Sequence, residues 1–136
     1  MKKNNPTTRW IVGLAFILIV YSCFYLFFAE NPDIYEVPRK IRHVIKFSVT
    51  VLVYCIGTHF LGKIEARWMF VIWHFIHVSF LVVITSVGLY DWTFGMVNIA
   101  TKEFVASMQE MLISPALYVG MGIVNQRWSS LNSTKN

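Results

Sequence analysis

A set of polar side chains in the segment 102–125 is the strongest candidate for chemistry in this sequence. Five of them follow one another at steps of three or four residues, which places them on one face of a helix: Glu103, Ser107, Glu110, Ser114 and Tyr118. Gln109 is a further polar candidate beside them. The segment is otherwise apolar enough for hydrocarbon, where a carboxylate is costly unless it faces protein, water or a cation. We therefore expect Glu110 and its face to point inward, toward partner helices.

Lys46 is the natural partner for Glu110. It belongs to a second polar stripe at helical spacing: Arg39, His43, Lys46, Thr50, Tyr54 and Gly57. At 1.5 Å per residue, Lys46 and Glu110 lie about 22 Å and about 21 Å above the same end of their helices. Matched depth predicts a buried ion pair, in which removal of one partner typically costs about 3–5 kcal/mol. The alternatives are that Lys46 snorkels to the headgroups while Glu110 stays protonated, or that a ligand or ion contacts Glu110.

A basic cluster at the start of the second stripe, Arg39, Arg42 and His43, is a candidate anion site. It could bind an anionic headgroup, a polyprenyl phosphate or an acidic partner segment. The alternative is local neutralisation by the acids of the preceding loop: Glu30, Asp33 and Glu36. We prefer this alternative slightly because the acids are as numerous as the nearby cations.

His74 and His77 lie three residues apart in an apolar run and are possible ligands. We favour interhelical hydrogen bonding over haem or metal binding, because no carboxylate is expected at their depth and haem ligation needs a partner at similar depth. No cofactor and no metal are expected. Cys23 and Cys55 differ in depth by about 10 Å and are not expected to form a disulfide.

These candidates must be positioned by membrane-spanning helices. The chain of 136 residues is 56% hydrophobic and 14% charged, whereas average domains carry about 25% charged residues. Four apolar runs predict spans over residues 10–28, 44–61, 68–90 and 104–124, and the run at 10–28 is too long for a signal peptide. Pro115 is expected to kink the last span. The predicted fold is an all-α integral membrane protein, a four-helix antiparallel transmembrane bundle formed as one membrane domain over residues 1–136.

Orientation follows from the distribution of Lys and Arg. Seven lie on the side of the two termini and of the loop 62–67, and five on the other side. The positive-inside rule therefore predicts both termini in the cytoplasm of a multi-pass protein in a cell membrane, which we expect to be a bacterial cytoplasmic membrane. We attribute the formal charge of +5 to membrane topology and lipid contact. Nucleic-acid binding is not expected, since it would need a basic stripe on a soluble fold.

The sequence favours a small accessory or scaffold subunit that binds another membrane protein or an anionic lipid. We expect membrane lipids and a membrane-protein partner or a second copy as its partners. The alternative is a small oligomeric transporter or ion-coupled module that uses the intramembrane Glu110. An enzyme acting on a lipid-linked substrate is the third hypothesis, and it has the least support because no catalytic motif is found.

Overall fold

The computed structural model describes residues 5–64 and 66–133, and every regular element in this part of the chain is helical. Its α-helices are α1 (Pro6–Phe24), α2 (Arg39–Leu61), α3 (Arg67–Phe94), α4 (Ile99–Ile113) and α5 (Ala116–Ser133). A π-helical turn, η1 (Tyr25–Ala29), prolongs α1, and a short 3₁₀ turn, η2 (Pro32–Tyr35), lies in the connection to α2. The all-helical class predicted from the sequence is confirmed for these residues.

The helix ends fall at residues with clear local preferences. Pro38 stands at the extended position just before α2, where its missing N–H costs nothing. The side chain of Asn31 caps η2 by accepting a hydrogen bond from the backbone N–H of Asp33 at 3.0 Å. Gly95 ends α3 in the left-handed conformation, with φ of 65°, which glycine adopts without steric cost. These signals set the connections between helices at one end of the molecule.

Three helices are long and apolar enough to cross a membrane: α1 with η1 (Thr7–Ala29, 23 residues), α2 (23 residues) and α3 (28 residues). Large hydrophobic side chains are exposed along their outer faces. Examples are Phe27 at 75% and Phe75 at 73%. A water-soluble monomer rarely exposes contiguous apolar surface of this extent.

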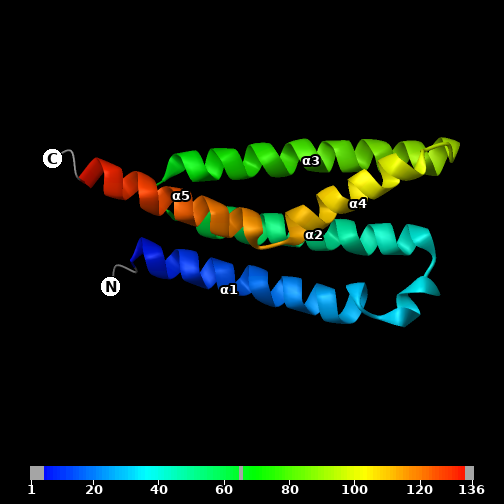
Figure 1. The fold of residues 1–136 in the computed structure, drawn as a ribbon, viewed down its shortest axis with the longest axis horizontal. Helices are drawn as coiled ribbons and strands as arrows, with labels where there is room; N and C mark the ends of the chain where they lie inside the picture. The colour runs from blue at the N-terminus through cyan, green and yellow to red at the C-terminus, as the bar shows by residue number, and fades with distance from the viewer. Residues whose placement is uncertain (1–4, 65, 134–136) are drawn as a thin grey trace.

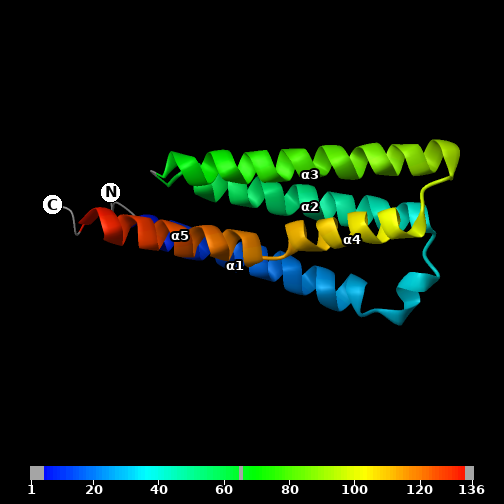
Figure 2. The ribbon, with the colours of Figure 1, turned by 45° about the horizontal axis from the view of Figure 1, so that its top comes forward.

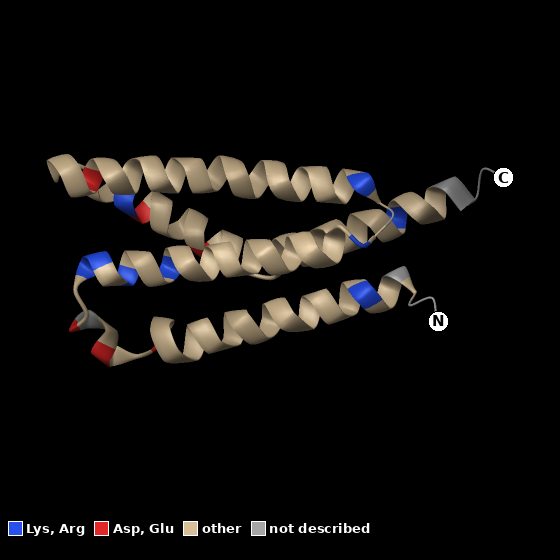
Figure 3. Ribbon diagram, turned by 180° about the vertical axis from the view of Figure 1, so that it is seen from behind, with Lys and Arg blue, Asp and Glu red and all other residues tan. Residues whose placement is uncertain are grey.

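Consecutive long helices run in opposite directions (Figure 1). α2 packs against α1, α3 and α4, and α4 also packs against α3. The start of α1 and the end of α5 lie at the same end of the molecule, and a second view shows α4 and α5 following one another back toward that end (Figure 2). Charged residues gather toward the two ends of the molecule, leaving its middle almost uncharged (Figure 3).

Two tryptophan side chains pack directly against glycines of neighbouring helices and thereby fix how these helices lie against one another. Trp73 of α3 lies directly against Gly57 of α2, where a Cβ would collide with the indole, and its Nε1–H donates to the carbonyl of Tyr54 at 3.3 Å. Trp10 of α1 lies in the same way against Gly122 of α5. Trp73 is 1% exposed. These close approaches are possible only where a residue lacks a side chain.

The last predicted span, over residues 104–124, is broken. The expected helix with a kink at Pro115 is instead two helices, α4 and α5, because Ser114 leaves the helical region at φ of −63° and ψ of 141°. A residue before proline is pushed toward this extended conformation. Ser114 then caps α5, since its Oγ accepts a hydrogen bond from the N–H of Ala116 at 3.1 Å. The segment 104–124 is therefore two helices joined at Ser114 and Pro115.

Candidate functional site

Lys46 and Glu110 face each other between α2 and α4. The Lys46 Nζ lies 3.5 Å from Glu110 Oε1, so the contact predicted from matched depth is present. The burial predicted for it is wrong, because the Glu110 side chain is 64% exposed and the Lys46 side chain is 23% exposed. The pair lies at the edge of a cavity rather than inside packed helices.

The polar face of α4 does not turn into the interior, contrary to the expectation. Glu103 and Ser107 are exposed, and the Ser107 hydroxyl donates to the carbonyl of Glu103 at 3.0 Å. The interior is filled by an apolar face of the same helix: Val105, Met108, Leu112 and Ile113. Gln109 lies on this buried face and is 2% exposed. Burial of the larger apolar face outweighs burial of the stripe, because hydroxyls can be satisfied by their own helix.

Ser114 and Tyr118 are separated from Glu110 by the break. Tyr118 lies on α5, where it is fully buried and its hydroxyl donates to the carbonyl of Trp10 at 3.4 Å. Its ring stacks on Trp10 at 5.8 Å and meets Trp73 edge-on. Tyr118 is therefore a packing residue of the core and does not join the predicted stripe.

A cavity of about 630 Å³ opens between the end of α1, the start of α2 and α4. We call it the basic cavity. Four Lys and Arg side chains line it against two Glu side chains: Arg39, Arg42, Lys46 and Lys102 against Glu103 and Glu110. Its apolar wall comes from the last turns of α1 and from η1, including Phe24 and Phe28. The basic cluster predicted from the sequence thus lines a cavity that also has an apolar wall.

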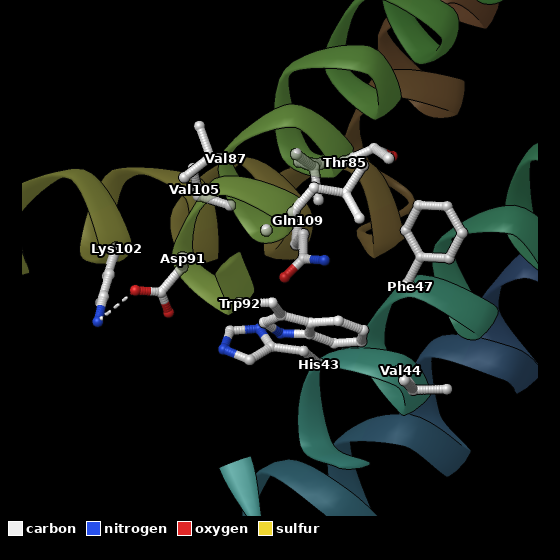
Figure 4. A pocket seen from close by; sticks show the side chains of 13 residues that line it. His43, Val44, Phe47, Thr85, Val87, Asp91, Trp92, Lys102, Val105 and Gln109 are labelled. Atoms are coloured by element: carbon white, nitrogen blue, oxygen red, sulfur yellow. Dashed lines mark ion pairs between the residues drawn. The ribbon is translucent and has the colours of Figure 1, made fainter. Parts of the chain in front are cut away.

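Two ion pairs in the described part of the chain join different helices. Besides Lys46 and Glu110, Lys102 Nζ lies 2.8 Å from Asp91 Oδ1 (Figure 4). This second pair joins the start of α4 to the end of α3. Sequence reasoning missed it, although a carboxylate and an ammonium flanking a turn marked by Gly95 were a usable signal.

His74 and His77 are placed by α3 against α2. Their Nδ1 atoms donate to carbonyls of their own helix, those of Phe70 at 2.9 Å and Trp73 at 3.0 Å. Both rings pack on Tyr54 of α2 with centroids 5.4 Å away. The predicted interhelical hydrogen bonds are replaced by interhelical aromatic contacts. Within residues 5–64 and 66–133, no group of three His, Cys, Asp or Glu side chains could hold a metal ion.

A second, smaller pocket of about 190 Å³ lies on the other side of α4, between α2, α3 and α4. We call it the Gln109 pocket. Gln109, His43 and Lys102 line both hollows. The chemistry available at this end of the molecule is therefore charge-assisted binding in one hollow and apolar binding with one buried amide in the other.

Comparison with known proteins gives no relative: no protein-family model, curated protein or solved structure matches this chain. The function is therefore argued from the geometry alone.

Proposed function

We propose that this chain is an integral membrane protein whose helices form a four-helix antiparallel transmembrane bundle, with α4 and α5 together as the fourth crossing. The three long apolar helices and the apolar outer surface support this. The stretch from Ile99 to Val124 would be about 39 Å long at 1.5 Å per residue if its two helices were collinear. That length exceeds the roughly 30 Å of hydrocarbon even with a bend.

We further propose that both termini lie in the cytoplasm of a cell membrane. Single cysteines at Asn31 and Lys63, in a background without Cys23 and Cys55, test this with a membrane-impermeant thiol reagent. The Asn31→Cys variant should react in intact cells, and Lys63→Cys only after permeabilisation. Reaction of Lys63→Cys but not Asn31→Cys in intact cells would indicate the opposite orientation. Equal reaction of both variants in intact cells would refute the membrane-spanning arrangement.

Within the membrane, we propose that the protein is an accessory subunit that binds an anionic lipid. The observation that carries this is the basic cavity, which Arg39, Lys46 and their neighbours line together with an apolar wall. A phosphate headgroup would meet the cations, and its acyl or prenyl chain would lie on Phe24 and Phe28. The volume of about 630 Å³ lies within the range typical of small-molecule sites. Of the partners expected from the sequence, it favours a lipid over a helix of another protein.

Binding of phosphatidylglycerol against phosphatidylcholine tests the lipid proposal, using purified protein and native mass spectrometry of the retained lipids. The double variant Arg39→Gln, Lys46→Gln should lose the preference for phosphatidylglycerol. The matched control is Arg67→Gln, an exposed cation at the opposite end of the molecule. Equal retention of the two lipids by the unmodified protein, or an equal loss of preference in the control, would refute the proposal.

Ion-coupled transport is the second candidate, and the break after Glu110 favours it. Discontinuous helices that point their ends at a central site recur in transporters. Here the chain breaks four residues after an exposed carboxylate that lines the basic cavity. Flux through liposomes should then require titration at Glu110 and disappear in Glu110→Gln. A lipid-binding subunit without transport would show no flux in either form.

A further inference from the structure

The Gln109 pocket carries an inference of its own, separate from the basic cavity. It is enclosed by the first turns of α2, the last turns of α3 and the middle of α4. Figure 4 shows the Gln109 amide directed into it, toward the rings of His43 and Trp92. Most of its other lining residues are aliphatic or aromatic, among them Phe47 and Val105, and the ion pair of Asp91 and Lys102 lies in its wall.

Gln109 brings an unpaired polar group into this apolar space. The residue is 2% exposed, and its Oε1 has no hydrogen-bond partner among the residues that the structure describes. Buried amide oxygens are almost always paired, because leaving one unpaired costs about 1–3 kcal/mol. A polar partner from outside the chain would remove this cost. The partner must be able to donate a hydrogen bond.

The pocket also has the size and access needed for the apolar part of a ligand. Its volume of about 190 Å³ somewhat exceeds that of a dry apolar cavity of about 150 Å³ known to bind benzene in another protein. Side chains of its rim are exposed on the outer surface of the helices, namely Val44 at 50%, Leu89 at 57% and Trp92 at 47%. In a membrane these residues face lipid, so a ligand can enter sideways from the bilayer.

A charged ligand is disfavoured here. Lys102 Nζ lies 2.8 Å from Asp91 Oδ1 and both residues line the pocket, so an anion would meet the Asp91 carboxylate and a cation would meet the Lys102 ammonium. A hydroxyl suits the amide best, since it donates to Oε1 and can accept from the amide nitrogen, and it fits either orientation of the amide. We infer that the Gln109 pocket binds a neutral membrane lipid through a free hydroxyl group, with the adjoining carbon chain on the apolar walls.

The test compares two probes that differ in one hydroxyl, 1-decanol and decyl methyl ether, added to the protein in phosphatidylcholine nanodiscs. Incorporated 5-fluorotryptophan gives a ¹⁹F resonance for each of the five tryptophans, and Trp92→Phe assigns the one that lines the pocket. That resonance should shift with 1-decanol at about two- to tenfold lower mole fraction than with the ether, the equivalent of one hydrogen bond. The other four resonances serve as internal controls.

Two variants and a control complete the experiment. Gln109→Leu replaces the amide with an apolar side chain of similar size, so the responses to the two probes should become equal. Gly88→Leu should abolish the response to both probes. Gly88 lines the pocket and an added Cβ meets no atom within 4 Å, so the leucine side chain has room to fill the space that a probe would occupy. Gln126→Leu changes an exposed glutamine of α5 and should behave like the unmodified protein. The double variant Arg39→Gln, Lys46→Gln should also respond like the unmodified protein, because the inference does not rest on the basic cavity.

Three results would overturn the inference. Equal responses to the two probes in the unmodified protein would mean that water, rather than a ligand hydroxyl, satisfies Gln109. An unchanged response in Gly88→Leu would place binding elsewhere. Shifts of equal size at all five tryptophans would indicate a general effect on the bilayer.

Discussion

The pair between Lys46 and Glu110 gives a prediction whose magnitude depends on what fills the basic cavity. At 3.5 Å, two unit charges attract by about 1.2 kcal/mol in water and by about 5 kcal/mol at an effective dielectric constant of about 20. The Glu110 side chain is 64% exposed and lines the basic cavity, so water in this cavity would place the pair near the first limit. After the loss of side-chain entropy we expect a coupling energy of about 0.5–1 kcal/mol, below the 3–5 kcal/mol that a fully buried pair would give.

A double-mutant cycle measures this coupling. Lys46→Met, Glu110→Leu and the double variant would be unfolded in mixed micelles by increasing mole fractions of dodecyl sulfate, and the free energies of unfolding compared. Each single change should lower the free energy of unfolding by about 0.5–1 kcal/mol, and the double variant should recover most of one loss. Glu103→Leu provides the matched control, because Glu103 is an exposed carboxylate two turns earlier on the same helix. Combined with Lys46→Met, it should be additive.

Purely additive losses for the Lys46 and Glu110 changes would refute the contact itself. A coupling energy above about 3 kcal/mol would refute the open cavity instead, since such a value requires a pair withdrawn from water. Repeating the cycle with added phosphatidylglycerol extends the test. A phosphate competing with Glu110 for Lys46 should reduce the coupling toward zero.

Two further predictions concern the packing and the break. Gly57→Ala should lower the free energy of unfolding by about 1–3 kcal/mol in the same dodecyl sulfate titration, because the added Cβ collides with Trp73. Gly120→Ala is the control and should be neutral or stabilising, since a Cβ there meets no atom within 4 Å. Equal effects of the two changes would contradict the close approach of Trp73 to Gly57. Ser114→Ala should lower the free energy of unfolding by about 0.5–2 kcal/mol, since the N–H of Ala116 loses its hydrogen-bond acceptor. Ser114→Asp can still accept this hydrogen bond and should retain most of the stability. No change in stability for Ser114→Ala would argue for an unbroken helix.

Much of the architecture could be predicted from the sequence because it follows from long-range hydropathy. Apolar runs located the three long helices, and their alternating direction follows from short connections. The contact between Lys46 and Glu110 was predictable for a related reason: once direction is known, 1.5 Å per residue converts sequence position into depth. Helical depth needs no knowledge of side-chain packing.

The rotation of α4 could not be predicted in the same way. Spacing showed that Glu103, Glu110 and Ser107 share a face, but it could not say whether that face or the face of Leu112 and Gln109 is buried. The decision depends on the neighbouring helices, which offer apolar surface on one side and the basic cavity on the other. For the same reason Gln109 was only a minor candidate, although it is the buried polar residue that lines both hollows.

The turn at Ser114 and Pro115 has a consequence for the space between the helices. Before the turn α4 packs against α2 and α3, and after it α5 packs against α1 through Tyr118 and Gly122 and against Trp73 of α3 through Tyr118. Every α4 residue that lines the basic cavity lies before the turn, between Ile99 and Ile113, and no described residue of α5 lines it. The turn therefore marks the end of the cavity along this part of the chain.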